Sequence, residues 1–434
     1  MYTARWLQRR QEKPQRPGRI LQRAMSIQII LPEDTLEAKP NGEPMVRHSG
    51  DEIRGHLEVT TRGNFEFEVS LSFEGLVRTW FGFQNDGDPC RLPPTAEFQF
   101  LQETQKLYSD PSSGSIKDQL RIHRLPFQFV VPHELISARS DVHPDFLKLC
   151  PSTKQGPAFC SLPSRKVFRQ PLILYAIRIK HIRTDKVVEN FMRSTYHREI
   201  AIMPHIPPAP PLAMEAFIRE YKPSTMRSVR QHRWTRLLGT LRLSAAEPSP
   251  VNILSSGFGP STVVTLSLAF APNGPCGSEI WPCEWSCVVS NYLRIRTFYS
   301  TQRMERMPTL SEAKRDSFLR VHEMKTALEV REHSELSWNN DDACQWSTKV
   351  NVPIRVMKNL LPTFLNQLSA RQYAVVIRLA IKGLSHGLLE LVLPLQVIYY
   401  PTLSETFETP HREGTARDEL LSSDVDFSPP SYDS

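Results

Sequence analysis

The feature that most constrains the fold is a repeated alternation of apolar and polar side chains. In residues 65–75, FEFEVSLSFEG, phenylalanine, valine and leucine occupy every second position, and glutamate and serine lie between them. A period of two is typical of a β-strand with one face in a core and one face in water. The alternation returns at 262–270, 373–381 and 389–400. We therefore expect long amphipathic strands in both halves of the chain.

The segments between these strands favour turns, and helical periodicity is scarce. Gly, Pro, Asp and Ser cluster in stretches such as 84–95 and 150–157, which is typical of loops between antiparallel strands. The best helical candidate is 308–330, which holds either a helix or a long insertion. The pattern predicts an all-β fold of antiparallel sheets in sandwiches, without alternating βα units.

A proline-rich segment divides the strand-rich sequence into two parts. Five prolines fall within residues 204–211, and such a run forms a stiff, extended spacer. We predict one β-sandwich domain at 26–205, a hinge at 206–228 and a second β-sandwich domain at 229–401. The polar, acidic and aperiodic residues 402–434 are predicted to be a disordered tail.

The two ends of the chain carry opposite charge. Residues 1–24 have a net charge of +6 and residues 402–434 a net charge of −6, in a chain whose total is +7. This distribution indicates flexible tails on a folded unit, so no nucleic-acid partner is expected. The basic leader could be a mitochondrial presequence or could touch anionic lipid, although Pro14 and Pro17 oppose a long helix. We favour a disordered or spurious leader, with translation starting at Met25.

The cysteines indicate free thiols in a reducing compartment. There are seven, an odd number, with irregular spacing and no secretory signal peptide before them. Cys276, Cys283 and Cys287 lie close together, but gaps of six and three residues without a nearby histidine do not fit a four-ligand zinc site. We expect no metal and no cofactor. No apolar stretch approaches the roughly 20 residues of a membrane span, so any membrane role would be peripheral.

Several landmarks, taken in their order along the chain, resemble the arrestin family. HSGDEIRGHLEVTT at 48–61 resembles the turn and strand that mark the first arrestin domain, with Ser49 where proline is common. RLPFQFVVP at 124–132 and LILYAIRIKHI at 172–182 resemble later strands of that domain. The sequence from residue 237 resembles the opening of the second domain, and 369–401 resembles its close. The resemblance covers residues 26–401 and implies two arrestin-like β-sandwiches in tandem.

The chain closes on a motif that resembles the PPxY signal of fungal alpha-arrestins. Pro429, Pro430 and Tyr432 form it, and about 0.08 such matches are expected by chance at this composition. Adjacent prolines preset a polyproline II helix, which the aromatic grooves of WW domains bind. Ser423 and Ser428 are candidate phosphorylation sites, and a phosphate on Ser428 would add negative charge beside the motif.

The resemblance implies a non-enzymatic adaptor. Such a protein recruits a WW-domain HECT ubiquitin ligase to plasma-membrane transporters or receptors and so promotes their ubiquitylation and endocytosis. It would be cytoplasmic and peripheral at the plasma membrane and endosomes. One alternative is an arrestin-fold scaffold of a retromer-like endosomal sorting complex that does not use the PPSY motif. Another is a hydrolase on a β-sandwich, although the sequence holds no G-x-S-x-G, H-E-x-x-H or phosphate-loop motif.

A basic patch is predicted to bind cargo or lipid. Its members are Arg165, Lys166, Arg169, Arg178, Lys180, Arg183 and Lys186. Arg178 and Lys180 alternate with apolar residues, so they are expected to face out of the sheet. A basic face would attract acidic or phosphorylated cytosolic segments and anionic lipid headgroups. The alternative is an ordinary solvated strand face.

Overall fold

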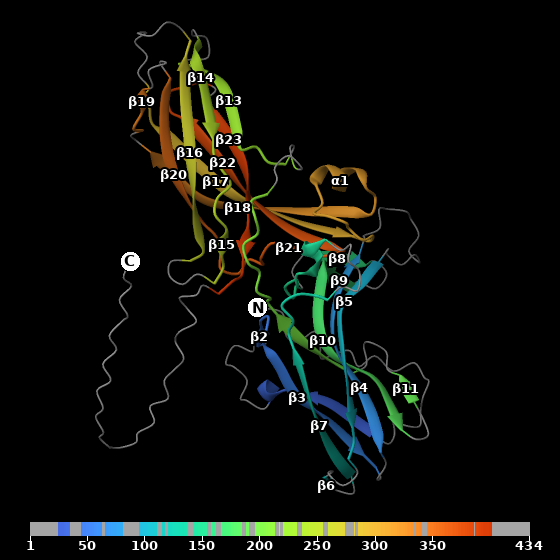
Figure 1. Cartoon of the computed structure of the whole chain (residues 1–434). Coiled ribbons are helices and arrows are strands. Elements are labelled where there is room, and N and C mark those ends of the chain that lie inside the picture. The colour runs from blue at the N-terminus through green and yellow to red at the C-terminus, as the bar shows by residue number, and fades with distance from the viewer. Residues whose placement is uncertain are drawn as a thin grey trace, which may run out of the picture. The chain divides into compact units, whose positions relative to one another are not determined.

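The computed structural model shows an all-β protein built of antiparallel sheets, which confirms the predicted fold class (Figure 1). The predicted leader and tail lie outside the residues that the structure describes. The structure describes residues 25–34, 45–62, 66–80, 95–110, 115–117, 120–136, 143–153, 158–161, 166–184, 188–190, 196–212, 217, 220–231, 237–254, 259–273, 282, 285–333, 336–340, 345–385 and 387–401.

The strands of residues 25–202 form two main sheets. One sheet has the order β1-β3-β7-β6 and the other β2-β12-β10-β4-β5, with β11 beside β10 and a separate β8-β9 pair. β2 and β12 run parallel, and the other pairs are antiparallel. The strands are β1 Met25–Ile30, β2 Val46–Arg47, β3 Glu52–Thr61, β4 Phe67–Trp80, β5 Thr95–Tyr108, β6 Ser115–Lys117, β7 Leu120–Val130, β8 Ala158–Ser161, β9 Lys166–Arg169, β10 Leu172–Thr184, β11 Val188–Asn190 and β12 His197–Ile202.

The core of this first sandwich lies between the two sheets. Alternate residues of β7 point inward, so that Phe127 and Phe129 are 3% and 5% exposed. From the opposite sheet, Phe73 packs against Phe129 with ring centroids 5.8 Å apart, and Tyr175 lies 6.2 Å from Phe73. Burial of each such side chain contributes about 1.5–3 kcal/mol to stability. The hydrophobic alternation therefore builds the sandwich directly.

Strand β4 departs from the expectation of one buried and one solvated face. Its polar residues Ser70, Ser72 and Glu74 are also buried, with Glu74 only 1% exposed. β4 is an inner strand with β10 on one side and β5 on the other. The Glu74 carboxylate forms ion pairs with Arg178 and Lys180 of β10. Because these charges neutralise one another, the polar face of the strand can be removed from water.

The strands of residues 224–398 form the second group of sheets. The two larger sheets have the orders β13-β14-β16-β20-β19 and β18-β17-β22-β21, with β23 beside β22, and β15 pairs in parallel with β24. β13 begins inside the segment predicted as a hinge. The strands are β13 Ser224–Arg230, β14 Leu237–Ser244, β15 Val251–Asn252, β16 Ser261–Pro272, β17 Cys287–Ser300, β18 Leu319–His333, β19 Asn339–Asn340, β20 Trp346–Arg355, β21 Phe364–Leu365, β22 Ser369–Ile381, β23 Leu388–Leu395 and β24 Val397–Ile398.

The alternation predicted for β16 and β23 is confirmed, whereas β22 also buries Ala374 and Val376 on its other face. In β16, Leu266, Leu268 and Phe270 are at most 1% exposed, whereas Thr265, which precedes Leu266, is exposed. Val264 on the same strand and the alternate leucines of β23 are buried in the same way. These side chains share one hydrophobic core with β22 of the facing sheet. The second half of the chain is therefore also a β-sandwich.

The segment 308–330 contains much less helix than its composition allows. Helix α1 covers Leu310–Arg315, and β18 begins at Leu319. Thr309 caps the helix, because its side chain accepts a hydrogen bond from the Glu312 amide at 3.2 Å. The Glu312 carboxylate in turn accepts a hydrogen bond from the Thr309 amide. Strand β18, which takes up residues 319–330 of this segment, pairs with β17, because cross-strand hydrogen bonding outweighs their local helix propensity.

The two sandwiches belong to one compact unit and contact each other directly. Thr79 at the end of β4 donates a hydrogen bond to the carbonyl of Ser300 on β17 at 2.6 Å. Phe364 of β21 and Leu368, which immediately precedes β22, pack into the hydrophobic core of the first sandwich. Contacts between the halves are thus both polar and apolar.

Candidate functional site

The residues of the predicted ligase motif lie outside the described part of the chain. This holds for Pro429, Pro430 and Tyr432 and for the candidate phosphorylation sites Ser423 and Ser428. The structure therefore leaves these predictions untested. Among the described residues, the features that could serve binding or regulation lie where the two sandwiches meet the segment that connects them.

The predicted basic patch is only partly described. Arg165 and Lys186 lie outside the described residues, and Lys166 and Arg169 lie in β9, of whose side chains the structure says nothing. On β10, Arg183 is exposed. Its role in binding stays a prediction.

The predicted exposure of Arg178 is wrong. Arg178 is 7% exposed, and its Nε lies 3.0 Å from Oε2 of Glu74. Lys180 is partly buried and pairs with the other oxygen of the same carboxylate, which also accepts a bond from Ser72 at 3.1 Å. Desolvation lowers the pKa of Arg178, and the charge of Glu74 opposes that shift. Arg178 and Lys180 therefore neutralise a buried acid, and neither forms a free positive face.

A groove of about 160 Å³ follows the segment that connects the two sandwiches. Ile206, Pro207 and Leu212 of that segment line it, together with Leu149 from the first sandwich and Leu395 from the second. The segment is held by side chains as well as by packing. The Gln396 side chain accepts a bond from the Ala209 amide at 3.0 Å and donates to the Ala209 carbonyl at 3.1 Å. The predicted stiff spacer is thus anchored to the second sandwich.

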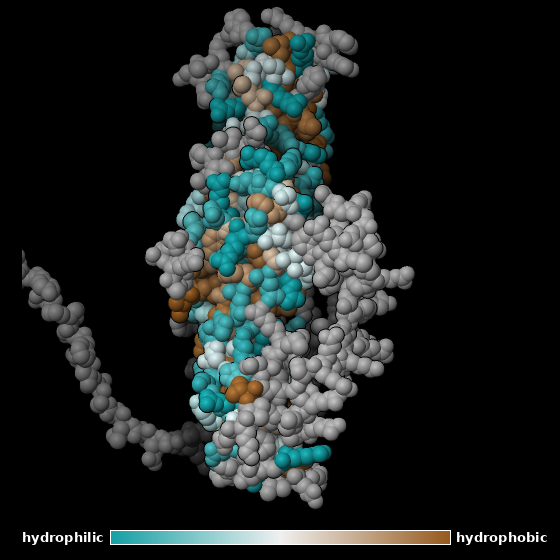
Figure 2. Space-filling model, turned by 90° about the vertical axis from the view of Figure 1, so that its right-hand side faces the viewer, coloured by the Kyte–Doolittle hydropathy of each residue, from teal (hydrophilic) through white to brown (hydrophobic). Residues whose placement is uncertain are grey.

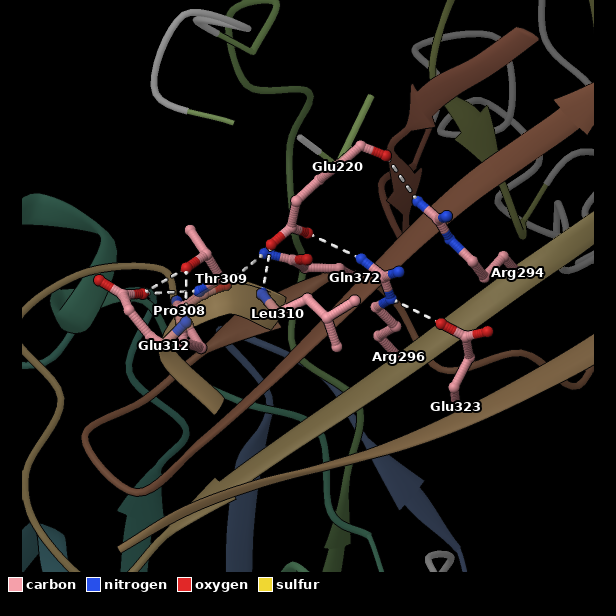
Figure 3. Close-up of polar contacts among 9 residues, drawn as sticks. All are labelled: Glu220, Arg294, Arg296, Pro308, Thr309, Leu310, Glu312, Glu323 and Gln372. Carbon is pink, nitrogen blue, oxygen red and sulfur yellow. Dashed lines mark hydrogen bonds and ion pairs between the residues drawn. The ribbon is translucent and has the colours of Figure 1, made fainter. Parts of the chain in front are cut away.

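A buried ion-pair network fixes the end of the connecting segment (Figure 3). Oε2 of Glu220 accepts a bond from Nη1 of Arg296 at 2.8 Å, and the two side chains are 3% and 7% exposed. Nε of Arg296 donates to Glu323 on β18, also at 2.8 Å. Arg294 donates to the Glu220 carbonyl at 3.0 Å. Glu220 therefore joins the connecting segment to the centre of the β17–β18 pair.

The same carboxylate reaches the loop before helix α1. Oε1 of Glu220 accepts a hydrogen bond from the Leu310 amide, and Gln372 on β22 donates to the Pro308 carbonyl at 3.2 Å (Figure 3). Burial acts to raise the pKa of Glu323, but the bond from Arg296 lowers it overall. The network thus joins the connecting segment, the β17–β18 pair and the loop before helix α1.

Two buried tyrosines lie beside this network. Burial, with a contribution from Glu220, raises the pKa of Tyr221 to about 12. Tyr373 on β22 donates its hydroxyl hydrogen to the Leu361 carbonyl and accepts a bond from Nε of Arg371 at 2.8 Å. Both phenols are therefore neutral at physiological pH and act as structural groups.

Three aromatic rings stack where the first sandwich ends. His48 and His205 have ring centroids 5.7 Å apart and an interplanar angle of 16°. Tyr399 stacks on His48 at 5.5 Å and on His205 at 6.3 Å. Nε2 of His48 and the Tyr399 hydroxyl share a hydrogen bond of 2.7 Å. The stack brings together residues that are far apart in the sequence.

The turn at 48–51 positions the first of these rings. Gly50 has a φ of +88°, a conformation that glycine adopts without strain, and its amide donates to the Val131 carbonyl at 2.8 Å. The Asp51 carboxylate accepts a bond from the His48 amide at 2.7 Å. The Ser49 hydroxyl accepts a bond from the His205 amide at 3.0 Å. The sequence pointed to this turn but gave no sign of its distant partners.

On the face in Figure 2, the described residues are mainly hydrophilic, with small groups of hydrophobic residues interspersed. Within the described ranges, no group of three or more His, Cys, Asp or Glu side chains is placed to hold a metal ion. No helix in the described part of the chain is long and apolar enough to cross a membrane.

Comparisons with known proteins identify no relative. Neither the protein-family models nor the curated protein sequences match this chain. The function is therefore argued from the residues and from the geometry.

Proposed function

We propose that this protein is a non-enzymatic adaptor resembling alpha-arrestins, which recruits a WW-domain HECT ubiquitin ligase to membrane transporters or receptors. The observation that carries the proposal is the PPxY motif of Pro429, Pro430 and Tyr432 on a chain with two β-sandwiches. Two adjacent prolines and a tyrosine two positions after the second proline are the groups that a WW domain recognises.

The β-sandwiches would hold the cargo, and the motif would hold the ligase. Sheets give a rigid framework with broad faces, which suits recognition of cytosolic segments of transporters or receptors. Proximity of ligase and cargo then promotes ubiquitylation and endocytosis without chemistry from this chain. The adaptor would act in the cytoplasm, at the plasma membrane and at endosomes. Anionic lipid headgroups are a further proposed contact, through exposed cations such as Arg183.

The direct test is capture of the full chain by isolated WW domains of a HECT ligase from the same organism. Tyr432→Ala removes the ring that fixes the register of the motif, and we expect binding to fall at least about ten-fold. Ser431→Ala is the matched control, because the position between proline and tyrosine is not read by the groove. It should bind like the wild type.

The same variants distinguish the alternative function. If neither the wild type nor Ser431→Ala binds WW domains, the ligase adaptor is wrong and a sorting-complex scaffold that does not use PPSY becomes the better proposal. If Tyr432→Ala binds as well as the wild type, the motif does not carry the interaction. Loss of cargo ubiquitylation in cells with Tyr432→Ala alone would support the adaptor.

A further inference from the structure

Three histidines and a tyrosine lie close together at the end of the first sandwich. We call His48, His133, His205 and Tyr399 the histidine junction. His48 lies in the turn after β2, His133 follows β7, His205 lies in the connecting segment, and Tyr399 follows β24. The junction thus joins both sandwiches and the segment between them.

Backbone hydrogen bonds hold the same three regions together. The Met203 amide donates to the Arg47 carbonyl at 2.9 Å. The Ile206 amide donates to the Tyr399 carbonyl at 2.7 Å, and the Tyr399 amide returns a bond to Ile206 at 3.3 Å. The stacked residues are part of this ladder or next to it, because Arg47 precedes His48 and Ile206 follows His205. Any change that separates the rings therefore acts on the contact between the connecting segment and the second sandwich.

The charges around His205 disfavour a proton on its ring. Burial, followed by the charges of His48 and His133, lowers the pKa of His205, and Asp51 opposes this only in part. Its other neighbours are the uncharged rings of Tyr399 and Tyr400. Asp51 is already engaged by His48, whose Nδ1 lies 3.4 Å from its Oδ2. The Asp51 carboxylate is thus shared between His48 and His205.

We propose that the histidine junction is a proton-sensitive contact, which is closed near neutral pH and loosens when the surroundings become acidic. The sign follows from linkage. A histidine whose pKa is lowered in the closed state binds a proton more readily when the contact opens. The closed state is therefore fully favoured above the ordinary histidine pKa of about 6.5, and it loses stability as the pH falls below that value. A second imidazolium stacked on the first adds direct repulsion. This inference does not depend on the proposed adaptor function.

The test is amide hydrogen exchange of the full chain at pH 7.5 and pH 5.5, with rates corrected for the intrinsic effect of pH. We expect protection of residues 203–206 and 397–400 to fall at least about three-fold at the lower pH. Protection of the β16 core should stay constant. Equal protection of the junction at both pH values would overturn the proposal.

Two variants separate the junction from a general effect of acid. His205→Phe keeps a ring that can stack but cannot take up a proton, so the loss of protection at pH 5.5 should disappear. His322→Phe on β18 is the matched control and should behave like the wild type. If His205→Phe retains the full loss, the proposal is wrong. Should that variant fail to fold, the imidazole resonances of wild-type His205 decide, because a midpoint at or above about 6.5 contradicts the proposal.

Discussion

Removal of the Glu220 charge should destabilise the second sandwich measurably. Loss of one partner of a buried ion pair costs about 3–5 kcal/mol when the other charge is left unpaired. Here Arg296 keeps its bond to Glu323, whose side chain is 30% exposed, so we expect about 2 kcal/mol for Glu220→Gln. Glu220→Ala also removes the acceptor of the Leu310 amide and should cost about 1 kcal/mol more.

Thermal unfolding of the full chain checks this magnitude. For a unit of 150–250 residues, 1 kcal/mol corresponds to about 2–4 °C, so Glu220→Gln should lower the Tm by roughly 6 °C. The matched control is Glu329→Gln, because Glu329 forms an ion pair with Arg331 in which both side chains are well exposed. It should change stability by less than about 0.5 kcal/mol. Equal Tm values for the two variants would refute the reasoning.

A double-mutant cycle gives a second check on the same network. Arg296→Met leaves the buried Glu220 carboxylate without its arginine, and Glu220→Leu leaves Arg296 with Glu323 alone. The two changes together replace the buried pair by apolar side chains. The loss for the double variant should be smaller than the sum of the single losses by at least about 1 kcal/mol. Strict additivity would show that the two groups do not interact.

Three further predictions concern buried positions. Glu74→Gln leaves two basic partners on β10 without their carboxylate and should lower the free energy of unfolding by about 2–4 kcal/mol. Urea denaturation measures this loss, and an unchanged urea midpoint would contradict the prediction. Gly239→Ala places a methyl group 2.7 Å from the Phe270 ring, so we expect the free energy of unfolding to fall by about 1–3 kcal/mol. A Tm equal to that of the wild type would exclude the clash. Burial raises the pKa of Cys150 to about 12 and that of Cys287 to about 11. A thiol reagent at pH 8 should therefore label neither cysteine before the protein unfolds. Rapid labelling of either cysteine would show that its thiol is accessible.

The sequence alone determined the class of the fold. A period of two in β16, β22 and β23 is a local property, because neighbouring side chains of a strand point to opposite faces whatever the partner strand is. The same holds for the Pro-rich segment, whose residues exclude a helix. The PPxY motif is equally local, because its residues are adjacent in the chain.

The tertiary structure decided which polar residues are buried and which meet. Because Glu74 alternates with apolar residues, the sequence pattern predicts that it is exposed to solvent. Only the neighbouring strand β10 supplies the cations that allow its burial. His48 and Tyr399 are 351 residues apart, and Glu220 reaches Arg296 across 76 residues. Such contacts depend on how distant strands are placed, and the hydrophobic pattern says nothing about them. The sequence therefore determined the class of the fold, while the packing of the strands determined the junction.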